Sequence, residues 1–261
     1  MRARLPSGEE GAAIGESSRG ARAARPRLVL LPGMDGTGDL FAPFVRALPK
    51  GAEATVVRYP VDRPLGYDEL LPIARAALPA SGPYAIVAES FSGPIGIRIA
   101  AAAPANLRAL VLVASFARNP LPRSLGWLAG AASPALFRVR PPEAALRALL
   151  VGRAAPRELV EAVARAVGWV APGVMARRLR DVSDVDVESA LSSIRVPVLY
   201  VAGARDRLVG RRGLEGIRRR LPEVESIILD APHLVLQARP REAAAAIVEF
   251  AGRESARPRP E

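Results

Sequence analysis

His233 is the only histidine in this chain of 261 residues. Hydrolytic chemistry by a serine at neutral pH needs a proton shuttle, and histidine is the side chain whose unperturbed pKa suits that task. His233 lies just after the apolar run 227–229, in a predicted loop at the C-terminal end of a strand. Open α/β sheets place their functional groups in such loops. We therefore interpret His233 as catalytic rather than as a loop histidine with a purely structural hydrogen bond.

Ser90 is the candidate nucleophile because it lies at a predicted strand-to-helix turn. The apolar run 83–88 precedes it as a short buried strand, and an apolar helix is expected over 94–103, opened by a proline. A strained strand-to-helix turn exposes a nucleophilic serine in the pattern G-x-S-x-G. The structural alternative for Ser90 is an N-cap serine.

The residues around Ser90 depart from the usual pattern of a nucleophile elbow. The chain reads Ala88-Glu89-Ser90-Phe91-Ser92, so both flanking positions are small but neither is glycine. The turn needs small neighbours for steric reasons, and these residues satisfy that need. Ser92 is the rival hydroxyl, and we assign it to turn geometry because it occupies a position that requires a small residue.

A glycine-rich loop after the apolar run 27–31 is the candidate oxyanion loop. It begins Pro32-Gly33-Met34-Asp35-Gly36-Thr37-Gly38, and three glycines in six residues allow close backbone approach. Acyl transfer needs two backbone N–H groups aimed at the developing oxyanion. We predict that Met34 and Phe91 supply them, and that Asp35 accepts hydrogen bonds within the loop. A phosphate-binding loop is the alternative, but the glycine spacing is not G-x-G-x-x-G and no G-K-[ST] follows.

Asp206 is the candidate acid, in the exit turn of a third strand-like run at 197–203. Its role would be to hold the imidazole tautomer of His233 and to stabilise the imidazolium. The chain between Asp206 and His233 leaves room for one helix, over 211–221, and one strand, over 226–229. The rival acids are Asp184, Asp186 and Asp230. The structural alternative for Asp206 is that it is a solvated aspartate in a turn, with no catalytic role.

The chain order Ser90, Asp206, His233, with these loops, resembles the α/β-hydrolase superfamily. The resemblance covers about residues 26 to 252 apart from the middle segment, and the departures are Pro32, where many members carry histidine, and the elbow without flanking glycines. It implies an α/β-hydrolase fold, with a mostly parallel central sheet, helices on both faces and a helical cap insertion. The family includes esterases, acyltransferases, carbon–carbon hydrolases, lyases, cofactor-free haloperoxidases and non-catalytic receptors, so the fold alone leaves the reaction open.

The pattern of elements predicts how the chain is divided. We expect a disordered basic extension over 1–26, an α/β core over 27–114 and 194–252, a helical cap over 115–193, and a frayed tail over 253–261. The core alternates strands with helices as βαβ units do. The cap is predicted because the middle segment is too long for a simple connection, and its expected helices lie at 122–136, 142–151, 156–170 and 172–181.

Composition excludes several classes of function. Cysteine is absent, which excludes disulfides and thiolate catalysis, and with one histidine a zinc site is not expected. The net charge is +11, but the arginines are spread along the chain and aromatic residues are only 5%, so we expect no nucleic-acid partner. No signal-like apolar stretch follows the early arginines, and no run approaches the roughly 18 apolar residues of a membrane span. We therefore expect a cytoplasmic protein with no membrane span, metal or cofactor.

The expected function is hydrolysis of a small carboxylic ester, thioester or amide through a Ser90–His233–Asp206 triad and an acyl-enzyme. A carboxylesterase for short to medium acyl chains is the specific prediction. Acyl transfer, carbon–carbon cleavage or haloperoxidase-like chemistry on the same triad, and a non-catalytic ligand-binding module, are the alternatives. Apolar cap residues are the candidate substrate pocket, although ordinary cap packing explains each of them equally well: Trp127, Phe137, Trp169 and Met175.

Overall fold

A computed structural model describes residues 26–120 and 131–256. Six strands form one sheet in the order β2-β1-β3-β4-β5-β6, and every pair of neighbours is parallel. This arrangement confirms the predicted α/β class with a parallel sheet. The strands are β1 (Arg27–Leu31), β2 (Glu53–Val56), β3 (Tyr84–Glu89), β4 (Leu107–Val113), β5 (Val198–Gly203) and β6 (Glu225–Leu229).

The central strands are apolar along their whole length because the sheet is covered on both faces. All six residues of β3 are buried, and six of the seven residues of β4 are buried as well. The edge strands β2 and β6 instead carry exposed and half-buried residues. The continuous apolar runs in the sequence are therefore the strands at the centre of the sheet.

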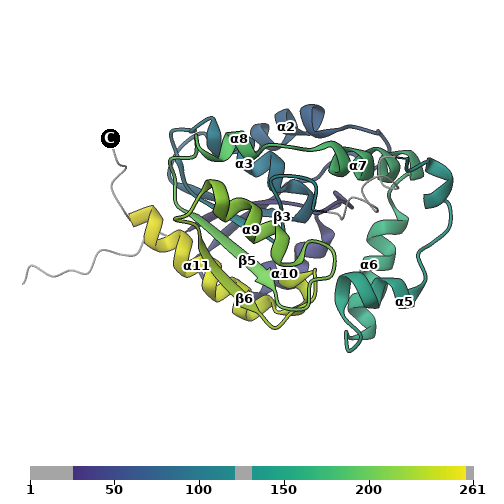
Figure 1. The fold of residues 1–261 in the computed structure, drawn as a ribbon. Helices are drawn as coiled ribbons and strands as arrows, with labels where there is room; N and C mark the ends of the chain where they lie inside the picture. The colour runs from purple at the N-terminus through teal and green to yellow at the C-terminus, as the bar shows by residue number, and fades with distance from the viewer. Residues whose placement is uncertain (1–25, 121–130, 257–261) are drawn as a thin grey trace, which may run out of the picture.

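Helices cover both faces of the sheet (Figure 1). One face packs against α2, α3, α8 and α9, and the other packs against α1, α10 and α11. Their bounds are α1 (Ala42–Ala47), α2 (Tyr67–Ala76), α3 (Gly93–Ala101), α8 (Glu188–Leu191), α9 (Gly210–Arg220), α10 (Val235–Ala238) and α11 (Pro240–Ala256). The short helices α8 and α10 were not predicted, since four residues are too few to show a helical period.

The segment between β4 and β5 is largely helical where it is described. It contains the 3-10 turn Pro134–Phe137, α5 (Glu143–Leu146), the π-helical turn Arg147–Val151, α6 (Arg157–Gly168) and α7 (Pro172–Asp184). Figure 1 shows α5, α6 and α7 on the side of the molecule opposite α11. An apolar cluster joins α6 to Leu40 and Leu234 of the core. Residues 122–130 of the first expected helix lie outside the described residues.

The C-terminal helix is longer than the sequence predicted. It continues to Ala256, so the expectation of a frayed tail from residue 253 was wrong for its first four residues. Arg253 pairs with Glu225 at the edge of the sheet, and the side chain of Glu254 is only 2% exposed. The expected extension over residues 1–25, and residues 257–261, lie outside the described part of the chain.

The strand order reverses direction between β1 and β3. The chain moves from β1 outward to β2, and then returns to the other side of β1 to build β3 to β6. Open α/β sheets bind ligands at such a reversal. The loop after β1 and the turn after β3 therefore meet there. Within the described residues no single helix is long and apolar enough to cross a membrane, and only α6 and α7 together, bent by 97°, reach that length and composition.

Candidate active site

Ser90 lies between the last residue of β3 and the first turn of α3, within a single 3-10 turn spanning Ser90–Ser92. Its backbone φ is 48°, a left-handed conformation that residues other than glycine rarely adopt. Such strain costs about 1–3 kcal/mol and persists only where the surroundings enforce it. The sequence prediction of a sharp strand-to-helix turn at Ser90 thus corresponds to an observed backbone outlier.

The turn is held by neighbours on α3 and after β4. The Ser90 carbonyl accepts hydrogen bonds from the Gly93 amide and, at 2.6 Å, from Ser115 Oγ. The rival hydroxyl Ser92 is fully buried, bonds to the Pro32 carbonyl and lies 2.9 Å from the Tyr59 hydroxyl. Ser92 therefore ties the elbow to the loop after β1, whereas Ser90 is only half-buried.

The structure brings the three predicted catalytic side chains together. Ser90 Oγ lies 2.8 Å from His233 Nε2, and His233 Nδ1 lies 3.0 Å from Asp206 Oδ2. The His233 and Asp206 side chains are 4% and 2% exposed, so the contact between them is shielded from water. Each residue follows a different strand, and the register of β5 with β6 brings the acid and the histidine together.

The Asp206 carboxylate is held in position by three hydrogen bonds. Oδ1 accepts hydrogen bonds from the amides of Leu208 and Val209, at 2.8 and 3.2 Å, which leaves Oδ2 for the imidazole. Burial opposes ionisation most strongly, but the hydrogen bond and charge of His233 and the two amides outweigh it and lower the pKa of Asp206. Asp206 is therefore a carboxylate at neutral pH.

The rival acids lie elsewhere, each engaged with another partner. Asp230 forms ion pairs with Arg205 and Arg239, and its side chain is 67% exposed. Asp186 pairs with Arg118, and Asp184 accepts a hydrogen bond from Ser183.

The loop after β1 contains backbone amides without an acceptor among the described residues, and the Met34 amide is one of them. The Gly36 amide bonds to the Gly33 carbonyl at 3.0 Å, which closes a tight turn around Met34. Among the described residues nothing accepts a hydrogen bond from the Met34 amide. Asp35 Oδ1 accepts from the Thr37 amide and hydroxyl, as expected for a carboxylate that stabilises this loop. The Phe91 amide belongs to the first turn of a helix, where amides have no intrahelical acceptor.

Comparison with known proteins decides the family. The sequence profile described as "Alpha/beta hydrolase family" matches residues 28–247. The chain belongs to the alpha/beta hydrolase family. The α/β-hydrolase fold predicted from the sequence is thereby confirmed, and the described strands and helices agree with it.

Two curated relatives and one solved structure illustrate the similarity. The chain is 28% identical over 223 residues to a pimeloyl-[acyl-carrier protein] methyl ester esterase of Xanthomonas campestris, covering 78% of this chain and 86% of that protein. It is 32% identical over 224 residues to the polyketide synthase ThaQ of Burkholderia thailandensis, covering 75% of this chain but a tenth of that protein. A hydrolase from Oleispira antarctica superposes with a TM-score of 0.74 at 13% identity, over 87% of this chain and 90% of that one.

The predicted pocket residues of this alpha/beta hydrolase are divided between two places. Met175 and Phe137 pack near Met34 of the loop after β1, together with Val170 and Val174. Trp169 is 74% exposed and borders a separate cleft. Trp127 lies outside the described residues. The prediction of one apolar pocket that contains all four residues therefore has no support in the described part of the chain.

A buried carboxylate lies beside the candidate nucleophile, and the sequence analysis assigned it no role. Glu89 is 2% exposed and accepts hydrogen bonds from Gln237 Nε2 at 3.0 and 3.3 Å. Burial raises the pKa of Glu89 to about 7, with a further rise from Asp35, while the Gln237 hydrogen bond and His233 act in the opposite direction. No cluster of three or more metal-binding side chains occurs among the described residues.

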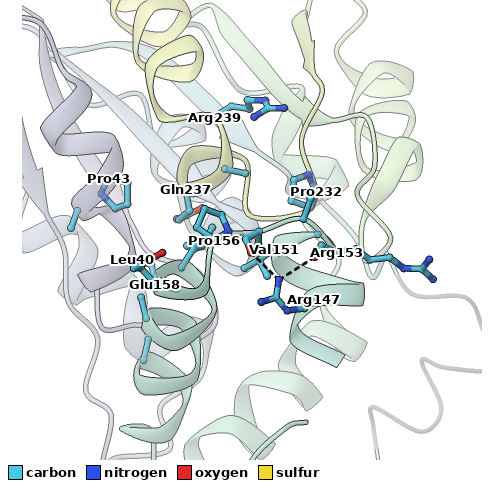
Figure 2. Close-up of a pocket in the computed structure, with 18 of the residues that line it drawn as sticks. Leu40, Pro43, Arg147, Val151, Arg153, Pro156, Glu158, Pro232, Gln237 and Arg239 are labelled. Carbon is cyan, nitrogen blue, oxygen red and sulfur yellow. Dashed lines mark hydrogen bonds between the residues drawn. The ribbon is translucent and has the colours of Figure 1, made fainter. Parts of the chain in front are cut away.

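An arginine-lined cleft of about 970 Å³ separates α6 from the core beside the His233 loop (Figure 2). Pro232 and Gln237 form its inner wall, while neither Ser90 nor His233 lines it. Seven arginines and three acidic side chains surround this cleft: Arg46, Arg147, Arg153, Arg165, Arg205, Arg207 and Arg239, with Asp39, Glu158 and Asp230. Of these arginines, Arg46, Arg153 and Arg207 form no ion pair with any described residue.

Proposed function

We propose that this alpha/beta hydrolase cleaves a carboxylic ester through an acyl-enzyme formed on Ser90. The observation that carries the proposal is the connected set Ser90–His233–Asp206, with 2.8 and 3.0 Å between the interacting atoms. A hydrogen-bonded nucleophile, base and orienting acid are the signature of an activated serine. The strained backbone of Ser90, at φ 48°, supports the same role.

In the first half-reaction His233 Nε2 accepts the Ser90 hydroxyl proton while Ser90 Oγ forms a bond to the ester carbonyl carbon. The resulting tetrahedral intermediate collapses as the bond to the leaving alkoxide breaks, and His233 gives its proton to that alkoxide. Water then repeats the sequence on the acyl-enzyme and releases the carboxylic acid. Asp206 stabilises the imidazolium in both steps and stays ionised throughout, because it takes no proton itself.

The amides of Met34 and Phe91 are proposed to bind the oxyanion. The Met34 amide has no acceptor among the described residues, and the Phe91 amide lies in an open first turn next to the nucleophile. Two such donors are what acyl transfer requires at the developing negative charge. Loss of one donor typically costs about 10²–10³ in kcat.

Hydrolysis of p-nitrophenyl esters from acetate to palmitate tests this proposal. We expect turnover by the wild-type protein and none above background by Ser90→Ala, with Ser192→Ala, an exposed serine directly after α8, as the matched control. Retained turnover in Ser90→Ala would contradict the mechanism. No turnover of any ester by a folded wild-type protein would favour acyl transfer, carbon–carbon cleavage or ligand binding.

A second, narrower candidate is an ester whose acyl chain is attached to a negatively charged carrier. The arginine-lined cleft favours this candidate, because its lining next to the His233 loop has seven arginines and three acidic side chains. One relative is named for a methyl ester on an acyl-carrier protein. An acidic carrier would complement this cleft and gain in association rate from its charge.

Charge reversal separates the two candidates. Arg46→Glu and Arg153→Glu should raise the KM for a methyl ester bound to a carrier protein by tenfold or more, and leave the KM for the free methyl ester within twofold. Arg75→Glu, an exposed arginine on α2, is the control. Equal effects on both substrates, or no effect on either, would remove the carrier from the proposal and leave ester hydrolysis intact.

A further inference from the structure

Arg178 on α7 is fully buried, with 0% exposure, yet it carries a charged side chain. Its guanidinium donates three hydrogen bonds, and all three acceptors are backbone carbonyls. Nη1 bonds to Met34 O at 2.8 Å and Asp35 O at 3.0 Å, and Nη2 bonds to Pro60 O at 2.8 Å. A side chain from the segment between β4 and β5 therefore fastens the loop that follows β1.

No carboxylate neutralises this guanidinium at ion-pair distance among the described residues, because Arg178 takes part in none of the ion pairs found there. Its Nε is buried and has no acceptor in the described ranges 26–120 and 131–256. The ring faces of Tyr59 and Phe91 lie 5.8 and 5.9 Å from Cζ. Arginine keeps its proton in proteins, so a fixed positive charge remains beside the loop at neutral pH. Burial lowers the pKa of Arg178, and the charges of Asp35 and Asp181 oppose that effect without forming ion pairs. A buried charge without an ion-pair partner is costly, which raises the question of what Arg178 does there.

The acceptors of Arg178 define the conformation of Met34. In a trans peptide the N–H points opposite to the preceding C=O. The Gly33 carbonyl is directed toward the Gly36 amide, so the Met34 N–H in the same peptide unit is directed away from the turn. Arg178 then fixes the peptide on the other side of Met34 through the Met34 carbonyl. Both peptide planes that flank Met34 are thus set, and its amide is left free.

The second predicted oxyanion donor also contacts this side chain. The Phe91 ring lies against the guanidinium and stacks on Tyr67 with 4.7 Å between ring centroids. Gly36 makes room for the guanidinium, since a Cβ atom there would lie 2.6 Å from Nη1. One side chain of α7 therefore contacts both residues whose amides are assigned to the oxyanion.

We propose that Arg178 is a positioning residue for the oxyanion hole, which fixes the Met34 peptide and places a positive charge behind the Met34 and Phe91 amides. The inference rests on the proposed function, because it needs an oxyanion to stabilise. Preorganised dipoles and charges of this kind act where negative charge develops in the transition state. They contribute to kcat rather than to ground-state affinity.

A purely structural role is the competing explanation, in which Arg178 only ties α7 to the core. That role predicts lower thermal stability with an unchanged kcat in the folded population. The positioning role predicts that kcat falls while KM is nearly constant. The positioning role also predicts weaker binding of an inhibitor that forms an oxyanion, with no matching loss of affinity for the substrate.

The test compares Arg178→Met and Arg178→Lys with the control Arg177→Met, a neighbouring arginine that pairs with Asp181 and Glu69. For p-nitrophenyl butyrate we expect Arg178→Met to lower kcat about 10²-fold, with KM within threefold. The Ki of an alkyl trifluoromethyl ketone, which adds Ser90 to form a hemiketal oxyanion, should rise by a similar factor. Arg178→Lys should recover part of kcat, since an ammonium keeps the charge but cannot hold three carbonyls in one plane. Arg177→Met should leave kcat for the ester and Ki for the ketone unchanged.

If Arg178→Met does not fold, as judged by near-ultraviolet circular dichroism, Arg178→Lys carries the test with an expected kcat at least tenfold below wild type. A folded Arg178 variant with wild-type kcat and ketone affinity would overturn the inference. If Ser90→Ala is inactive in the same assay, only the role of Arg178 fails. If Ser90→Ala is as active as wild type, the proposed function fails with it.

Discussion

A Cβ atom on Gly93 would lie 1.7 Å from Ser115 Oγ, the hydroxyl that donates a hydrogen bond to the Ser90 carbonyl. The first turn of α3 can approach Ser115, two residues after β4, only because position 93 has no side chain. The elbow pattern G-x-S-x-G places its last glycine at position 92, where this chain has serine. In this chain the close approach that requires glycine lies at position 93, one residue after the last glycine of that pattern.

Gly93→Ala should therefore destabilise the protein strongly, and Ser115→Ala should relieve part of that loss. Overpacking of a tight site costs about 1–3 kcal/mol, and we expect the upper end of that range in urea unfolding. The double variant should recover about 1 kcal/mol relative to additivity, as residues in contact do. Gly252→Ala, on α11 with no atom within 4 Å of the added Cβ, is the control. Additive losses would show that the two side chains do not compete for space.

Asp206→Asn should abolish most turnover while the protein stays folded. An asparagine cannot stabilise the imidazolium and can hold His233 in the wrong tautomer, which in a serine protease costs about 10⁴ in kcat. Steady-state kinetics with a p-nitrophenyl ester measure the loss. Asp184→Asn should keep wild-type kcat, since the carboxylate of this rival acid accepts its hydrogen bond from Ser183. A larger loss in Asp184→Asn than in Asp206→Asn would reassign the acid.

Glu89 should make the stability depend on pH. The folded protein keeps the Glu89 proton up to about pH 7, whereas an unperturbed glutamate releases it near pH 4.5. The folded state therefore binds more protons in this interval, and the free energy of unfolding falls as the pH rises through it. The fall is on the order of 3 kcal/mol.

Glu89→Gln removes that titration, so its stability relative to wild type should increase between pH 5 and pH 8. Urea unfolding at several pH values measures the difference, with Glu215→Gln, an exposed residue on α9, as the control. Parallel curves for Glu89→Gln and wild type would show that Glu89 is ionised throughout.

Gly36→Ala should impair both stability and turnover. Gly36 has φ 72°, and its added Cβ would lie 2.6 Å from Arg178 Nη1 and 3.0 Å from Tyr59 Cβ. Alanine at a positive φ costs more than about 1 kcal/mol, and displacement of the guanidinium should lower kcat. Gly173→Ala on α7 meets no atom within 4 Å and should stabilise the helix by up to about 1 kcal/mol. Thermal unfolding and ester hydrolysis together distinguish the two substitutions, and an unchanged kcat in Gly36→Ala would contradict the role of the turn.

The sequence predicted the sheet and the strand ends because those features leave local signals. Apolar runs become strands, central or at the edge, and Ser90, Asp206 and His233 each follow one of them. A parallel sheet brings such loops to one edge whatever the details of packing. The fold could therefore be predicted without knowledge of any long-range contact.

Features that depend on side-chain packing left no such signal. Arg178 stands between Arg177 and Arg180 on one helix, and nothing in the sequence shows that it alone is fully buried. Glu89 looks like a surface residue until β3 is placed at the centre of the sheet. The end of α11 at Ala256 depends on the distant partner Glu225 of Arg253.

The most direct test of the account is the site of covalent labelling by a fluorophosphonate, read by mass spectrometry of the digested protein. We predict a single phosphonylated residue, Ser90, with labelling at least tenfold slower in Asp206→Asn and absent in Ser90→Ala. Labelling at Ser92, Ser115 or another residue, or equal labelling in all three proteins, would contradict Ser90 as the activated nucleophile.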